Sequence, residues 1–132
     1  MTIRAKNALI VEDDLLISLL EKKLLTHLGF HVTKTVTKGR LAVEAVKDHK
    51  PDFIIMDICL ADDVNGLAAA KEIWEISEVP IVFVSGNIDL YRSDINSQFK
   101  GHAFVSKPFS KRILLEAIDR ACSPVPYKEH VA

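Results

Sequence analysis

The chain has 132 residues, 48% of them apolar and 27% charged, and its formal net charge at pH 7 is −1. This length and balance are typical of a single globular domain with a substantial core. The near-neutral charge argues against a nucleic-acid-binding protein, and no apolar run reaches the roughly 20 residues that cross a bilayer. We therefore expect no direct nucleic-acid or membrane partner, and a cytoplasmic protein whose two cysteines stay reduced.

Short apolar runs alternate with amphipathic segments along the whole chain. The runs predict strands at 7–11, 31–35, 52–56, 80–84 and 102–106. The segments between and after them predict helices at 15–29, 38–50, 66–77, 88–99 and 110–122. In the first helix a repeat at helical spacing is expected to face the core, formed by Ile17, Leu20, Leu24 and Leu28. Thr37 is expected to cap the second helix.

This alternation of strand and helix indicates βαβ units, and hence a parallel sheet with helices on both faces. The expected fold class is α/β, a flavodoxin-like doubly wound (βα)5 domain with a five-stranded parallel sheet in the order 2-1-3-4-5. We expect residues 1–122 to form this domain. Residues 123–132 contain two prolines and little periodicity, and are expected to be a flexible tail or linker stub.

Polar residues follow the apolar runs at four of the five predicted strand ends. The first strand ends in Glu12, Asp13 and Asp14, and the third ends in Asp57. The fourth and fifth strands end in Ser85 and Lys107, respectively. Since the carboxyl ends of parallel strands share one edge, these side chains are expected to meet there.

The clustered carboxylates need a counter-charge. Two carboxylates about 4 Å apart repel by roughly 4 kcal/mol at an effective dielectric of about 20. Glu12, Asp13 and Asp57 therefore either take up a proton or recruit a cation. Hard oxygen ligands in a shallow site suit Mg²⁺, and a metal beside an aspartate, a lysine and a hydroxyl is suited to phosphoryl transfer. The simpler alternative is that each acid caps a helix or lies in solvent, and Asp13 or Asp14 is expected to cap the first helix.

Four motifs of the chain resemble those of the receiver domains of two-component response regulators. They are LIVEDD (9–14), PDFIIMDI (51–58), PIVFVSG (80–86) and FVSKPF (104–109), in the family's order and spacing. The resemblance covers residues 6–122. Over this range the chain is similar to a single receiver domain of the chemotaxis-regulator type. It implies a phosphorelay protein that accepts a phosphoryl group from a sensor histidine kinase or a histidine phosphotransfer protein.

The resemblance also implies a role for each matching residue. Asp57 is the implied phosphoacceptor, and Glu12, Asp13, Asp57 and the backbone carbonyl of Cys59 are the implied Mg²⁺ ligands. The implied phosphoryl-binding and switch residues are Ser85, Gly86 and Lys107.

Two further implied features belong to the last strand and the turn after it. Phe104 stands where receivers carry a switch aromatic, although packing in the core also explains it. Pro108 is expected to follow a cis peptide bond.

The loop after Asp57 departs from the family pattern. It reads DICLADDVNG, lacks the usual proline, and is one residue longer before Gly66. It also carries Asp62 and Asp63, which either approach the metal or lie in solvent. The thiol of Cys59 and the side chain of Asn87 are placed where they could tune the access of hydrolytic water, and redox sensing by Cys59 is a further hypothesis.

The expected function is a phosphorylation-activated receiver that changes the face formed by helix 88–99, strand 102–106 and helix 110–122, and so controls a partner or output domain. It would be no enzyme beyond catalysing its own phosphorylation and dephosphorylation. The alternatives are a phosphorylation-independent docking module on the same fold and a metal-dependent phosphohydrolase. A flavodoxin-type flavin protein shares the expected fold, but EDD at the first loop would repel a phosphate.

Overall fold

A computed structural model of the protein describes residues 6–59, 65–87, 91–93, 95 and 102–123. Five parallel strands form one sheet in the order β2-β1-β3-β4-β5. The strands are β1 (Asn7–Val11), β2 (His31–Val36), β3 (Phe53–Asp57), β4 (Ile81–Ser85) and β5 (His102–Ser106). The predicted fold class and strand order are therefore confirmed.

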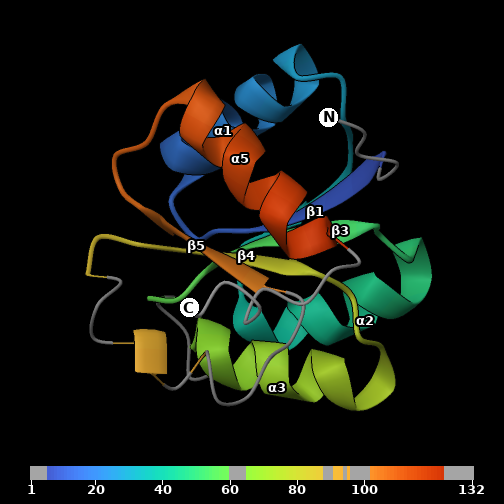
Figure 1. Ribbon diagram of the computed structural model, residues 1–132. Coiled ribbons are helices and arrows are strands. Elements are labelled where there is room, and N and C mark those ends of the chain that lie inside the picture. The colour runs from blue at the N-terminus through green and yellow to red at the C-terminus, as the bar shows by residue number, and fades with distance from the viewer. Residues whose placement is uncertain (1–5, 60–64, 88–90, 94, 96–101, 124–132) are drawn as a thin grey trace.

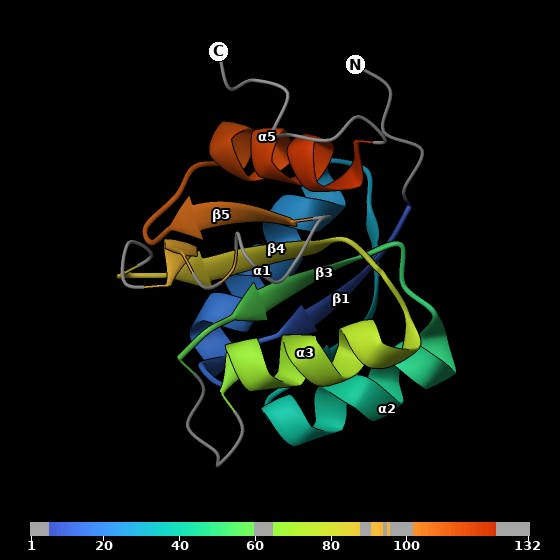
Figure 2. The ribbon, with the colours of Figure 1, turned by 60° about the horizontal axis from the view of Figure 1, so that its bottom comes forward.

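Helices cover both faces of the sheet. They are α1 (Leu15–His27), α2 (Gly39–His49), α3 (Gly66–Ile76) and α5 (Lys111–Cys122). α1 and α5 pack on one face, and α2 and α3 pack on the other (Figures 1 and 2). None of these helices is long and apolar enough to cross a bilayer.

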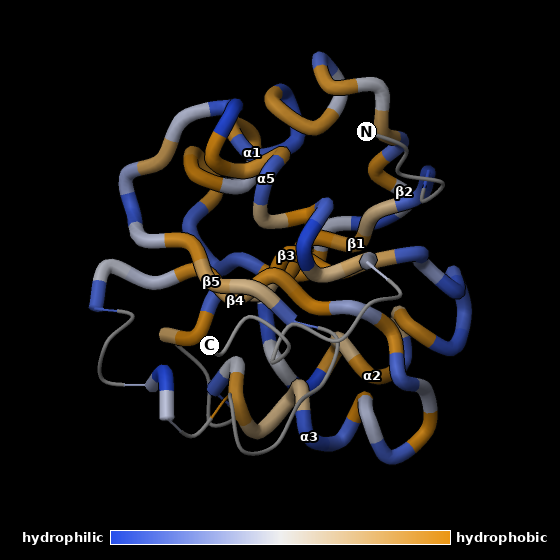
Figure 3. The backbone as a smooth tube through the Cα atoms, viewed as in Figure 1, coloured by the Kyte–Doolittle hydropathy of each residue, from blue (hydrophilic) through white to orange (hydrophobic). Residues whose placement is uncertain are grey.

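The central strands are apolar because both of their faces are covered. Successive residues of β1 enter different cores: Ala8 and Ile10 pack with the α1 and α5 side, and Leu9 and Val11 with the α2 and α3 side. Figure 3 shows the sheet as a largely hydrophobic centre surrounded by helices of alternating hydropathy. The two packed layers hold the carboxyl ends of the strands at one edge.

Most predicted elements agree with the structure to within two residues at each end. The predicted helix 88–99 falls mostly outside the described residues, where Leu90 and Phe99 also lie. Ile95 of this segment is fully buried, and Tyr91 packs against the same core. The prediction of Thr37 as a cap was wrong: Lys38 occupies the N-cap position, and no side chain caps α2 there.

The predicted core stripe of α1 was wrong at one position. Leu20 is 53% exposed, whereas Glu21 is 1% exposed. Ser18 and Leu25 are buried on the same side as Glu21. At about 100° per residue, the stripe through Ile17, Glu21 and Leu25 faces the sheet, and Leu20 lies a quarter-turn away from it. The repeat of leucines therefore predicted a buried position at Leu20, where the structure has an exposed one.

Gly66 brings the start of α3 against the end of β3. Its amide donates a hydrogen bond to the carbonyl of Ile58 at 2.9 Å. A Cβ added at Gly66 would lie 2.7 Å from the Cα of Ile58 and closer still to the carbonyl oxygen of Asp57. The position therefore requires glycine because another backbone approaches it.

We predict that Gly66→Ala destabilises the protein by about 1–3 kcal/mol, because the added methyl group must displace the backbone that carries Asp57. Urea unfolding followed by circular dichroism measures the change. Gly86→Ala is the matched control, since a Cβ there meets nothing within 4 Å. Equal stability of the two variants would contradict the close approach at Gly66.

Candidate functional site

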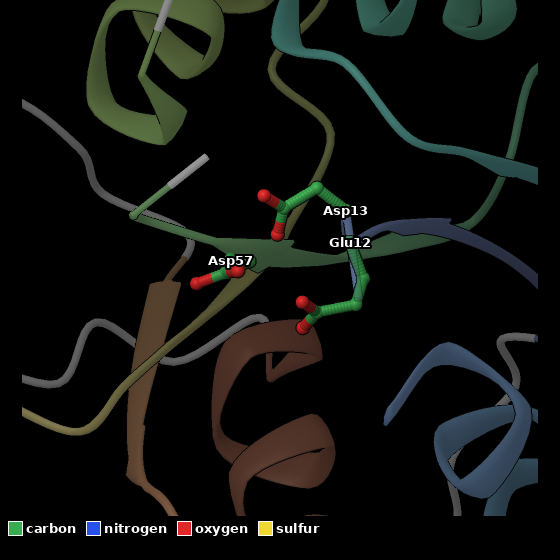
Figure 4. A group of neighbouring side chains, drawn as sticks. All are labelled: Glu12, Asp13 and Asp57. Carbon is green, nitrogen blue, oxygen red and sulfur yellow. The ribbon is translucent and has the colours of Figure 1, made fainter. Parts of the chain in front are cut away.

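Three carboxylates meet at the carboxyl edge of the sheet. Glu12 and Asp13 extend from the end of β1 and Asp57 ends β3, and their carboxylates gather beside the end of β3 (Figure 4). One oxygen from each lies within 4.8 Å of the others. Glu12 is 1% exposed and Asp57 is 3% exposed, so the repulsion between these groups is poorly screened by water.

Backbone hydrogen bonds hold Glu12, Asp57 and Asp14 in place. The amide of Glu12 donates to the carbonyl of Val36 at 3.0 Å, which extends the pairing of β1 and β2 by one residue. Oδ1 of Asp57 accepts from the amide of Cys59 at 3.1 Å. Oδ1 of Asp14 accepts from the amide of Ile17 at 3.1 Å. Asp14 is therefore the N-cap of α1, as predicted, and is separate from the acid cluster.

Lys107 supplies a positive charge to this cluster. Its Nζ lies 3.4 Å from Oε1 of Glu12 and 3.6 Å from Oδ1 of Asp57. Its backbone amide donates to the carbonyl of Ser85 at 3.0 Å, so the lysine is anchored to the end of β4. The Lys107–Pro108 peptide bond is cis, as predicted. The structure thus brings together the residues that the sequence placed at separate strand ends.

The charges at the site are unbalanced. Burial, with the hydrogen bond and the negative charge of Asp57, raises the pKa of Glu12 to about 7. Burial lowers the pKa of Lys107, but the charges of Asp57 and Glu12 outweigh that effect and raise it overall. Oε1 of Glu12 is buried and accepts no hydrogen bond. A single ammonium group beside three carboxylates therefore leaves room for a further cation.

Ser85 ends β4 next to the lysine, and Gly86 follows it. The hydroxyl oxygen of Ser85 is an acceptor for the amide of Asn87 at 3.0 Å, and the residue is 1% exposed. Gly86 is exposed, with open space where a side chain would stand. Asn87 is also exposed. A hydroxyl therefore lies beside an open position at the same edge as the acid cluster.

Phe104 lies on β5 and packs partly against the core on the α2 and α3 side. The guanidinium of Arg92 lies over its ring, 4.7 Å from the centroid. The ring of His102 meets it edge-on at 5.3 Å. The core-packing interpretation of Phe104 therefore describes this structure, and a switch role stays a prediction.

Cys59 follows β3 and is exposed. Its Sγ lies 3.7 Å from the hydroxyl of Tyr91, a contact that joins the segment after β3 to the segment after β4. Burial raises the pKa of the other thiol, Cys122, to about 11. Asp62 and Asp63 lie outside the described residues, so their predicted approach to the metal stays a prediction.

Sequence reasoning missed Glu21. This residue of α1 is buried, and neither of its carboxyl oxygens has a hydrogen-bond partner. Burial and the charge of Glu12 raise its pKa to about 8, against a smaller lowering by Lys107. The only signal in the sequence was its place on the stripe through Ile17 and Leu25, and a glutamate there reads as solvent-facing.

The protein is thus a doubly wound α/β domain with an acid cluster and a lysine at the carboxyl edge of its sheet, where ligands bind in such folds. The family model described as response regulator receiver domain matches residues 8–119. The chain belongs to this family, and it is a receiver domain of two-component systems.

Individual relatives agree with this assignment. The chain is 33% identical over 116 residues to the chemotaxis protein CheY of Thermotoga maritima, covering 87% of this chain and 96% of the relative. It is also similar to the solution structure of the PhyR receiver domain of Erythrobacter litoralis, with a TM-score of 0.78, 30% identity and coverage of 92% and 95%.

Another similar structure is the receiver domain of a sensor histidine kinase from Pseudomonas aeruginosa PAO1. The TM-score is 0.78, with 26% identity and coverage of 89% of this chain and 98% of that one. That structure holds a magnesium ion coordinated in its active site cleft.

We predict that Glu21→Gln stabilises the protein by about 2–4 kcal/mol at pH 8.5 and by much less at pH 4.5. The folded protein keeps the proton of Glu21 up to about pH 8, whereas the unfolded chain releases it near 4.5. Stability therefore falls as the pH rises between these values. Glutamine cannot ionise and has nearly the shape of a protonated glutamate, so the variant does not lose this stability.

Urea unfolding at several pH values measures this effect. Glu44→Gln, at an exposed position of α2, is the matched control and should leave the pH dependence unchanged. A Glu21→Gln variant that is less stable than the native protein at pH 8.5 would show that the carboxylate has a partner in solution.

Proposed function

We propose that this receiver is a switch operated by phosphorylation of Asp57. The observation that carries the proposal is the placement of Asp57 beside Glu12 and Lys107 at one edge of the sheet, with Lys107 in contact with both acids. Family membership supports the same assignment. The phosphoryl donor would be a histidine kinase or a histidine phosphotransfer protein.

We propose Glu12, Asp13, Asp57 and the backbone carbonyl of Cys59 as the residues that hold Mg²⁺. The three carboxylates are hard oxygen ligands, and the buried Oε1 of Glu12 accepts no hydrogen bond, so the donor set fits this ion. When bound, the metal would neutralise charge on the phosphoryl oxygens. The magnesium ion in the similar kinase receiver supports this choice.

The chain's own residues would then carry out the transfer. A carboxylate oxygen of Asp57 attacks the phosphorus, the bond between phosphorus and the donor imidazole breaks, and the imidazole leaves with the electron pair. The cysteine amide holds Oδ1 of Asp57 in place, and the ammonium of Lys107 neutralises charge beside it. The hydroxyl of Ser85 would donate to the phosphoryl group, and the open position at Gly86 would leave room for it.

The phosphoryl group would act on the rest of the protein through Ser85 and Lys107. Both are joined by the hydrogen bond between the Lys107 amide and the Ser85 carbonyl, and they end β4 and β5. Movement of these strand ends would repack the face formed by the segment after β4, by β5 and by α5, and Phe104 would rotate with it. Partners or an output domain would read this face.

The remaining assignments follow from this role. We propose that residues 1–122 form the receiver and 123–132 a tail or linker, since α5 ends at Cys122. The protein would act in the cytoplasm and catalyse only its own phosphorylation and dephosphorylation. No observation favours the metal-dependent phosphohydrolase, because position 59 offers a cysteine in place of a second acid beside Asp57.

The first test is intact mass after incubation with acetyl phosphate and Mg²⁺. We expect one added phosphoryl group on the native protein and none on Asp57→Asn or in the absence of Mg²⁺. Asp48→Asn, at an exposed position near the end of α2, is the control and should be labelled like the native protein. Labelling of Asp57→Asn at the native rate would refute the acceptor assignment, and no labelling from acetyl phosphate or a histidine kinase would favour the docking module.

A second prediction concerns Mg²⁺ affinity and pH. Glu12 must lose its proton to bind the metal, and its pKa is about 7, so affinity should fall by up to about tenfold per pH unit below 7. Titration calorimetry at pH 6 and pH 8 measures the change. Glu12→Gln should lose most of the affinity and this pH dependence, whereas Glu21→Gln should keep a fall near pH 7. An affinity that is equal at pH 6 and pH 8 would contradict a role for Glu12.

A further inference from the structure

The segment after β4 carries two neighbouring side chains, Tyr91 and Arg92, that contact different parts of the molecule. Ile95, in the same segment, is fully buried, and its amide donates to the carbonyl of Tyr91 at 3.0 Å. The ring of Tyr91 packs against the core on the α2 and α3 side. This stretch is therefore anchored in the core, and its two outer side chains join it to the elements on either side.

Tyr91 joins the stretch to the phosphorylation site. Its hydroxyl lies 3.7 Å from Sγ of Cys59, where the two groups form a weak hydrogen bond. The amide of the same cysteine donates to Oδ1 of Asp57 at 3.1 Å. Cys59 therefore links the carboxylate of Asp57 to the phenol of Tyr91.

Arg92 joins the stretch to β5. Its guanidinium lies over the ring of Phe104, 4.7 Å from the centroid, which is the geometry of a cation–π contact. His102 meets the same ring edge-on, with 5.3 Å between the centroids. The contact with Arg92 favours the present orientation of the ring, because a rotated ring would no longer lie under the guanidinium.

Both contacts belong to the arrangement that phosphorylation would change. In the proposed function, on which this inference rests, the phosphoryl group moves Ser85 and rotates Phe104. The segment after β4 would move with Ser85, because the hydroxyl of that residue accepts from the amide of Asn87 at 3.0 Å. A shifted segment moves the phenol of Tyr91 away from its partner sulfur, and a rotated ring leaves the cation–π contact of Arg92 broken.

We propose that Tyr91 and Arg92 restrain the switch by tying the segment after β4 to both of its neighbours. Tyr91 ties it to Cys59 after β3. Arg92 ties it to Phe104 on β5. A contact that exists in one of two states shifts the equilibrium towards that state by its own free energy. The restraint therefore lowers the affinity of the site for a phosphoryl group and for analogues of that group.

Binding of beryllofluoride tests the restraint, because this anion attaches to an aspartate carboxylate as a phosphoryl group would. Fluorine NMR at saturating Mg²⁺ measures its apparent dissociation constant. We expect Tyr91→Phe and Arg92→Gln each to bind about two- to fivefold more tightly than the native protein, since each loses one restraining contact. Loss of the positive charge by itself would weaken the binding of an anion, so tighter binding by Arg92→Gln identifies the lost contact.

Two matched controls remove similar groups elsewhere. Thr26→Val removes a hydroxyl that donates to the carbonyl of Lys22 at 2.8 Å on α1. Lys47→Gln removes one exposed positive charge from α2. Both should keep the dissociation constant within about twofold of the native value. Circular dichroism confirms that each variant is folded.

A double-mutant cycle tests whether Tyr91 acts through Cys59. In a Cys59→Ala background, which lacks the thiol, Tyr91→Phe should change the dissociation constant by less than about twofold, because the contact is already lost. A gain there as large as in the native background would show that the two side chains act separately, and would overturn the proposal.

The affinities of the single variants decide the remaining outcomes. A native or weaker affinity in Tyr91→Phe or in Arg92→Gln would also overturn the restraint. A native protein that binds no beryllofluoride would instead contradict the proposed phosphorylation of Asp57, and the restraint with it. The two failures are distinguishable, because the first requires a native protein that binds the anion.

Discussion

The parallel sheet holds three carboxylates close together at one edge. Their mutual repulsion is the constraint that governs the site. Glu12 and Asp57 are almost completely buried, and Lys107 is the cation that contacts both of them. The backbone leaves these groups little freedom, because they end packed strands and are held by amide hydrogen bonds. The fold therefore keeps like charges close together. Protonation of Glu12, a metal or a new ligand at the site would reduce the repulsion between them.

Close packing around β3 further restricts the groups at this edge of the sheet. Gly66 allows the start of α3 to lie against the backbone after Asp57, and the contact between Cys59 and Tyr91 joins the neighbouring segments. Packed side chains and hydrogen bonds that join several elements are the kind of connection through which a local change passes between them. This is the physical basis on which a phosphoryl group at one aspartate would reach β4, β5 and the segment that carries Tyr91.

α1 differs from α5 in which residues it buries and which it exposes. In α5 the buried positions are apolar, whereas α1 buries Glu21 and exposes four leucines, at positions 15, 16, 19 and 20. An isolated domain gains nothing from this inversion, since it costs desolvation on one side and leaves apolar area in water on the other. The four leucines therefore form a contiguous apolar surface on the outer side of α1.

The class of fold, the sheet edge that carries the site and the residues that gather there could all be predicted from the sequence. These follow from the alternation of strand and helix, and from the rule that parallel strands share one carboxyl edge. Packing in three dimensions decided which face of α1 is buried, because leucines on both sides of the helix made the periodicity ambiguous. It also decided the pKa values of Glu12 and Glu21 and the salt bridges of Lys107, since burial and distance depend on packing between distant segments.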